Sequence, residues 1–162
     1  MARIIKKHGD VFKIPLSEGN FSYAQWLADG TACYFLAAHS TEVSLSEVLT
    51  LPVAFRVLTF KDTPNRYGWV KLGNVPVPPE FCSSQYYAKK DPINGKLSIY
   101  FEGEERAATE EELKGLETAA VWAHPHIIER LEAQLQGRES AFLRNLSRPL
   151  KNSVPTSPTR QI

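Results

Sequence analysis

The sequence lacks any long hydrophobic run, and the longest one, residues 32–38, is only seven residues long. A membrane-spanning helix needs about 20 apolar residues, so the composition excludes a span of that kind. The basic start, residues 1–7, is not followed by the apolar region of a secretory signal. Only two cysteines occur, Cys33 and Cys82, which favours reduced thiols over a disulfide framework. We therefore expect a cytoplasmic protein without a membrane partner.

The sequence also lacks the motifs that carry common enzyme chemistry. It has no glycine-rich phosphate loop, no nucleophile elbow and no HExxH helix. His124 and His126 are two residues apart, so on a helix they point away from each other, and we interpret them as capping or surface residues rather than metal ligands. Cys33 is expected to be a small core residue, and nothing near Cys82 in sequence would lower its pKa. We predict a protein that is not an enzyme and uses no cofactor or metal.

The hydrophobic pattern indicates short strands with a few helices. Residues 8–16 place Phe12, Ile14 and Leu16 at alternate positions, as in a half-buried strand. Pro15 in that segment favours an edge strand or a bulge, because proline cannot donate to the ladder. Residues 20–27 predict a second strand with a bulge near Ala24. Residues 31–38 predict a central third strand, joined to the second by an Asp-Gly turn, so the three form an antiparallel meander.

Later segments add strands and capped helices. Two S/T-x-x-E capping boxes begin short helices. A longer helix is expected between Pro125 and Gly137. The further assignments are a capping box at 44–47, strands at 53–60, 68–72, 97–101 and 117–122, a polar loop at 61–67, a long excursion at 80–95, and a second box at 109–112. The predicted class is α+β, a strongly bent antiparallel sheet or small partly open barrel with two or three covering helices. We expect one domain, residues 1–147, with a Pro/Ser/Thr-rich tail, residues 148–162.

Charge is distributed unevenly along the chain although the net charge is only +1. Residues 102–132 contain nine glutamates and three basic residues, whereas residues 138–162 contain five basic residues and one glutamate. The glutamates have three readings: a solvated capped helix, a docking surface for a basic partner, or a catalytic pair. Sequence spacing cannot place two of them across a substrate cleft, as a glycosidase pair requires.

Aromatic residues with basic neighbours occur at Arg66-Tyr67 and at Tyr86-Tyr87 before Lys89-Lys90. On a small barrel they could stack on single-stranded nucleic acid, and on another fold they could anchor a protein interface. The acidic segment disfavours a polyanion, so we favour the protein interface. The alternatives are a small β-barrel that binds nucleic acid and an uncharacterised enzyme.

Three segments carry a family resemblance. Gly9-Asp10-Val11-Phe12-Lys13-Ile14-Pro15-Leu16 resembles the opening motif of the immunity protein 26 family of bacterial polymorphic toxin systems. Residues 68–76 and 103–116 are also similar, so the resemblance extends over residues 8–137. It implies a non-enzymatic protein that binds a cognate toxin and blocks its active surface. The resemblance assigns no functional residues.

We therefore expect the partner to be a toxin protein rather than nucleic acid. Toxins that cleave nucleic acid present basic surfaces, which carboxylates complement. A competing interface would centre on Arg66 and Tyr67. The residues predicted to contact the toxin are Glu102, Glu104, Glu105, Glu110, Glu111, Tyr86 and Tyr87.

Overall fold

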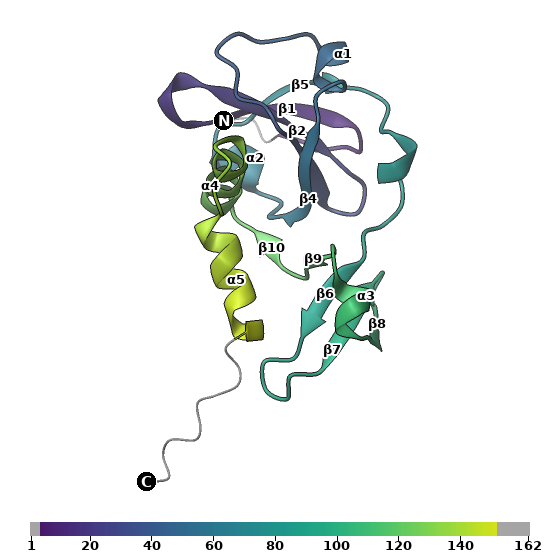
Figure 1. Cartoon of the computed structure of the whole chain (residues 1–162). Coiled ribbons are helices and arrows are strands. Elements are labelled where there is room, and N and C mark those ends of the chain that lie inside the picture. The colour runs from purple at the N-terminus through teal and green to yellow at the C-terminus, as the bar shows by residue number, and fades with distance from the viewer. Residues whose placement is uncertain (1–3, 152–162) are drawn as a thin grey trace. The chain divides into compact units, whose positions relative to one another are not determined.

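The computed structural model describes residues 4–151 and divides into two compact units (Figure 1). The first contains the described residues up to Ser83 together with Ala120–Ser140, and the second contains Ser84–Ala119 and the described residues from Ala141 onward. The predicted α+β class is confirmed, but the strands form two sheets instead of one. Neither sheet of residues 4–151 closes into a barrel, because the first and last strands of each sheet do not pair with each other. Residues 152–162 of the expected tail lie outside the described part, and the domain limits at residues 147 and 148 stay a prediction.

The first unit is built on a six-stranded sheet with the order β10-β4-β3-β2-β1-β5. Strands β1 to β4 pair as successive antiparallel neighbours, which confirms the predicted meander, and β10 pairs with β4 in parallel. The strands are β1 (Asp10–Pro15), β2 (Phe21–Trp26), β3 (Thr31–Phe35), β4 (Val53–Thr59), β5 (Val70–Asn74) and β10 (Val121–Trp122). The helices are α1 (Leu45–Val48), α2 (Thr63–Arg66) and α4 (His124–Leu135), with 3₁₀ turns at Ser17–Gly19 and Pro79–Phe81.

Strand β1 lies inside the sheet, so the prediction of an edge strand is wrong, while that of a bulge is confirmed. Phe12 and Ile14 are fully buried, as predicted. The strand pairs with β2 on one side and β5 on the other, and its register against β5 shifts between Val11 and Phe12. The pairing with β5 ends at Lys13, before Pro15, which pairs only with β2. Pro15 is tolerated because no ladder bond toward β5 is required at that position.

Strand β2 contains no bulge near Ala24, so that prediction is wrong. Its register is continuous against both β1 and β3. Tyr23, Ala24, Gln25 and Trp26 are all buried, and the uneven apolar spacing therefore has a different cause. A central strand covered on both faces does not need to alternate apolar and polar residues.

The Gly9-Asp10 pair of the opening motif has a structural role. Gly9 adopts φ +95°, and a Cβ at this position would lie 2.7 Å from the Val75 carbonyl oxygen, so only glycine fits. The buried Asp10 carboxylate forms an ion pair with Lys71 Nζ at 3.0 Å and accepts a hydrogen bond from Asn74 Nδ2 at 2.9 Å. Burial alone would raise the pKa of Asp10, but the hydrogen bonds outweigh it and the pKa is lowered. Gly9 and Asp10 together thus hold β1 against β5.

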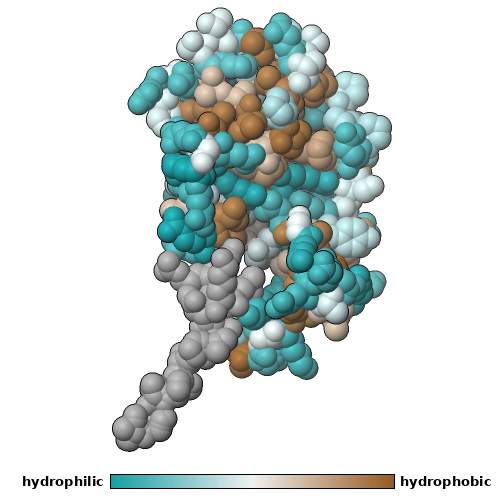
Figure 2. All heavy atoms as spheres, viewed as in Figure 1, coloured by the Kyte–Doolittle hydropathy of each residue, from teal (hydrophilic) through white to brown (hydrophobic). Residues whose placement is uncertain are grey.

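The core of the first unit has two parts. In one, the Phe12 ring packs against Trp26 and Trp69, with centroids 6.4 and 5.8 Å apart. The other consists of Val11, Tyr23, Phe35 and Val48, and α1 contributes to it. Figure 2 shows hydrophobic residues gathered on the part of the surface around α1. We call this the α1 surface, and its partly buried hydrophobic residues are Phe21, Val43, Leu45, Leu49, Leu51, Leu72 and Val75.

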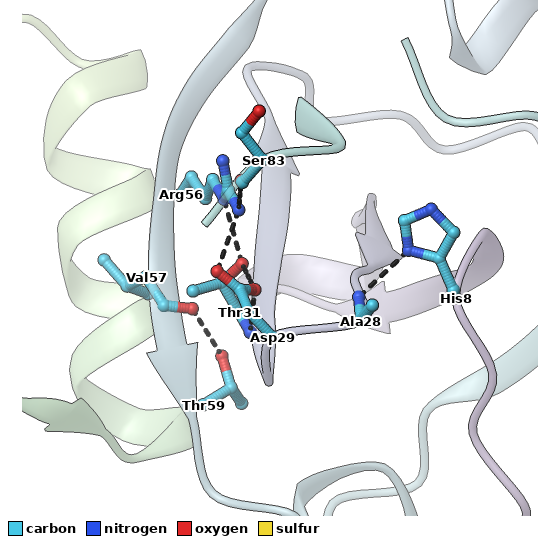
Figure 3. Close-up of polar contacts among 8 residues, drawn as sticks. All are labelled: His8, Ala28, Asp29, Thr31, Arg56, Val57, Thr59 and Ser83. Atoms are coloured by element: carbon cyan, nitrogen blue, oxygen red, sulfur yellow. Dashed lines mark hydrogen bonds and ion pairs between the residues drawn. The ribbon is translucent and has the colours of Figure 1, made fainter. Parts of the chain in front are cut away.

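Arg56 on β4 holds the chain at Ser83, where it leaves the first unit (Figure 3). Its side chain is 10% exposed and forms an ion pair with Asp29 at 2.9 Å. The same guanidinium donates to Thr31 Oγ1 at 2.9 Å and to the Ser83 carbonyl oxygen at 2.8 Å. Because Ser83 is the last residue before the second unit, this contact sets where the connecting segment leaves the sheet.

The helices largely follow their sequence signals. Ser44 caps α1, as predicted, by accepting a hydrogen bond from the Glu47 N–H. In α4, Pro125 lies in the first turn and Gly137 follows the helix with φ +71°. Its residues Ile127 and Leu131 are buried. The polar loop predicted at 61–67 is wrong in part, because residues 63–66 form α2.

The second unit is built on a four-stranded sheet with the order β8-β7-β6-β9. Its strands are β6 (Tyr87–Lys90), β7 (Leu97–Phe101), β8 (Glu104–Ala107) and β9 (Glu117–Thr118). It also contains α3 (Glu110–Leu113), which begins at the predicted capping box, and α5 (Ala141–Lys151). Neither β6 nor β8 was predicted as a strand. The single strand expected at 117–122 is instead two, β9 in this sheet and β10 in the other.

Candidate functional site

The predicted toxin-contacting residues all lie in the second unit, on β6, on β8, on α3 and on the segments beside them. Strand pairing decides which of them share a face. Glu104 lies opposite Phe101, whereas Glu105 lies opposite Tyr100, which in turn lies opposite Tyr87. Because neighbouring residues of a strand point to opposite faces, Glu104 and Glu105 are on different faces of the sheet.

A surface hollow of about 360 Å³ lies beside β7 and β8. Tyr86 stacks on Phe101 at its wall, with the ring centroids 4.0 Å apart and the planes 15° from parallel. Tyr86 is 49% exposed, so part of the ring remains available to a partner. We call this site the Tyr86 hollow, and it is lined by Tyr86, Ile99, Phe101, Glu102, Glu104, Glu105 and Arg106.

Tyr87, unlike Tyr86, is not exposed at the surface. It is 5% exposed and its ring packs near Tyr100, with centroids 6.3 Å apart. A side chain so covered cannot serve as a surface anchor, and the adjacent Tyr86-Tyr87 pair is therefore divided between the surface and the interior. The sequence alone does not predict which tyrosine is buried. That can be inferred only when β6 is known to begin at Tyr87, because successive side chains of a strand point to opposite faces.

Three of the glutamates are already paired within the unit. Glu105 contacts Lys89 Nζ at 2.9 Å and accepts a hydrogen bond from Ser98 Oγ at 2.7 Å. These bonds lower the pKa of Glu105, and the pKa of Lys89 is raised by the same pairing. The other two pairs join Arg106 to Glu112 at 3.1 Å and Lys114 to Glu111 at 3.3 Å. The local negative charge is consequently smaller than a residue count suggests.

Glu102, Glu104 and Glu110 are exposed and form no ion pair with any of residues 4–146. Glu102 and Gly103 both have positive φ, +49° and +84°, as the two-residue turn between β7 and β8 requires. This turn places Glu102 at the end of the hairpin, and Glu104 follows on the face that carries Phe101. Two unpaired carboxylates therefore border the Tyr86 hollow.

The competing surface around Arg66 and Tyr67 belongs to the first unit. Tyr67 stacks on His124 with centroids 4.3 Å apart, and the Arg66 guanidinium lies over the Tyr67 ring at 5.6 Å. The Trp69 indole Nε1–H donates to His124 Nδ1 at 3.1 Å. A smaller hollow of about 190 Å³ lies beside this stack and includes the exposed Phe60. His124 thus has a packing and hydrogen-bonding role.

The two thiols lie in different surroundings. Cys33 is buried in β3, and burial raises the pKa of its thiol to about 12. Cys82 is exposed, and its Sγ lies 3.6 Å from the Pro78 carbonyl oxygen. Among residues 4–151, no group of three or more His, Cys, Asp or Glu side chains is placed to hold a metal ion.

The family model for Immunity protein 26 matches residues 7–98, more than half of the 162 residues. The chain belongs to the Immunity protein 26 family. The match includes the opening motif and residues 68–76, but it ends before residues 103–116, the third segment of the resemblance. No curated protein and no solved structure gives a significant match.

Membership identifies an immunity protein, a class whose partner is a toxin, and it favours a non-enzymatic role. The matched residues cover the meander and the Tyr86 position, whereas Glu102 to Glu111 follow the match. In the part of the immunity protein that the structure describes, no helix is long and apolar enough to cross a membrane.

We expect the immunity protein to lose stability as the pH falls from about 7 to 5 because of His124. Burial lowers the pKa of His124 below its ordinary value of about 6.5. The unfolded chain therefore binds the proton more readily, so stability present above pH 6.5 is lost as the pH falls through the folded-state pKa. Urea unfolding at several pH values should show a smaller loss for His124→Gln, which accepts from Trp69 without titrating. Parallel curves for the two proteins would contradict the prediction.

Proposed function

We propose that the immunity protein neutralises a cognate toxin by covering a basic active surface with the acidic side of its second unit. The observation that carries this proposal is a set of exposed carboxylates that have no cationic partner among residues 4–146, namely Glu102, Glu104 and Glu110. A toxin that cleaves nucleic acid must attract a polyanion, so an inhibitor with the opposite charge can reach the same surface. The proposed contact residues are Tyr86, Glu102, Glu104, Glu105, Glu110 and Glu111, and Tyr87 is omitted because it is buried.

The paired and unpaired glutamates have different roles in this proposal. Glu105 and Glu111 are 47% and 79% exposed, and they share their charge with Lys89 and Lys114. Giving up such a pair costs only about 0–1 kcal/mol, but as long as it exists the lysine cancels much of the charge that attracts a toxin from a distance. The unpaired Glu102, Glu104 and Glu110 give up no internal partner on binding. They therefore supply the long-range attraction, while the exposed ring of Tyr86 supplies contact area.

The test is a titration of the cognate toxin's activity with the purified immunity protein. Inhibition by coverage requires one immunity protein per toxin, so we expect activity to reach its minimum at equimolar protein and the two chains to co-elute. Loss of toxin activity at a small fraction of the equimolar amount would instead indicate enzymatic inactivation. Absence of a complex would contradict the proposal.

A further inference from the structure

The Tyr86 hollow has a chemical character that goes beyond negative charge. Its wall is the stacked pair of Tyr86 and Phe101, and the buried Ile99 adds apolar surface. Stacking on Phe101 restricts the Tyr86 ring before any partner arrives, which reduces the entropy lost on binding. The volume of about 360 Å³ is at the lower end of ligand-site sizes and accommodates one long side chain.

The carboxylates at the edge of the hollow define the charge of its occupant. Glu102 and Glu104 have no cationic partner in the part of the chain whose side chains are described, residues 4–146. Arg106 also lines the hollow, on the same face of β8 as Glu104, but its guanidinium is held by Glu112 of α3 at 3.1 Å. The site thus combines an aromatic face, an apolar wall and two available carboxylates, and its own arginine is already paired with Glu112.

We infer that the Tyr86 hollow binds an arginine side chain presented by the toxin. A guanidinium stacks on an aromatic face and forms forked hydrogen bonds to carboxylates, whereas an ammonium does neither as well. The apolar stem of the arginine lies along the wall formed by Ile99 and Phe101. This inference rests on the proposed function for the source of the arginine, but the binding chemistry belongs to the hollow alone.

The test therefore uses a small probe in place of the toxin. Nα-acetyl-arginine amide is titrated into the full chain and followed by amide NMR shifts, with the citrulline analogue as a neutral control of the same shape. We expect the shifts produced by arginine to be centred on Tyr86, Phe101 and Glu104, weaker shifts from the lysine analogue and none from citrulline. Equal responses to arginine and citrulline would overturn the inference.

Variants of the hollow separate specific binding from general attraction. Tyr86→Leu keeps apolar area but removes the aromatic face, and should weaken arginine binding about threefold. Glu104→Gln should weaken it by a similar factor. Glu18→Gln, at an exposed carboxylate of the first unit, is the control with the same change of charge and should have no effect. If all three variants bind arginine equally, the hollow is not the site.

The outcomes also distinguish this inference from the proposed function. If arginine binds the hollow but the toxin forms no complex, the proposed function fails and the site remains. If the toxin binds with the same dissociation rate in wild type and Tyr86→Leu, the hollow is not used and the arginine inference fails. Substitution of a packed contact residue changes mainly the dissociation rate of a complex, so the dissociation rate is the quantity to compare.

Discussion

Replacing Phe12 by alanine is expected to lower the free energy of unfolding by about 3–5 kcal/mol, the range for emptying an aromatic core position. Phe12 lies on β1 between two paired strands and is fully buried. Its ring contacts Trp26 and Trp69, so truncation leaves a cavity among large, rigid side chains that cannot easily close it. This is the largest stability effect that we expect from a single side chain of the opening motif.

Phe60→Ala is the matched control, because it removes the same ring from a position that is 48% exposed. Chemical denaturation of both variants, with the denaturant dependence compared to the parent, measures the difference. A small loss for Phe60→Ala beside a large one for Phe12→Ala is expected. Equal stability of Phe12→Ala and the parent would show that the first strand does not face the core.

Local signals were sufficient to predict the first three strands and the starts of α1, α3 and α4. Phe12 and Ile14 alternate, Asp29-Gly30 marks the turn, and Thr109 forms a complete capping box with Glu112. These features depend on residues near one another in sequence, which is why they can be inferred without the fold. Pro15 predicted an edge strand or a bulge, and the structure shows the bulge in a strand inside the sheet; the proline is accommodated because the pairing with β5 stops two residues earlier.

The second sheet could be predicted only in part: the strand predicted at 97–101 is confirmed as β7, but the strands that flank it carry little hydrophobic pattern. All four residues of β8 are exposed and three of them are charged. Such a strand exists only because Glu102-Gly103 reverses the chain and pairs β8 with β7. The sequence therefore indicated which residue types form the candidate site, but not on which face of the sheet each side chain lies. Glu104 and Glu105 lie on opposite faces, and Lys89, 16 residues away in sequence, neutralises Glu105.

Changing Glu102, Glu104 and Glu110 together to glutamine is expected to slow association with the cognate toxin about tenfold at low salt. Electrostatic steering raises association rates by one to three orders of magnitude and depends on charges that no internal partner neutralises. These three carboxylates meet that condition, and all three are exposed, so the substitution should leave stability near that of the parent. The salt dependence of the rate should decrease in the same variant, because screening then has less attraction to remove.

The association rate of the toxin with three proteins tests most directly whether the acidic side of the second unit is the interface. The proteins are the parent, the triple glutamine variant, and a control with Glu18, Glu47 and Glu80 of the first unit changed to glutamine, which has the same net charge as the variant. We predict slow association and weak salt dependence for the triple variant alone. Equal rates for the variant and the control, with normal stability, would instead place the interface elsewhere, such as the α1 surface or the surface around Arg66 and Tyr67.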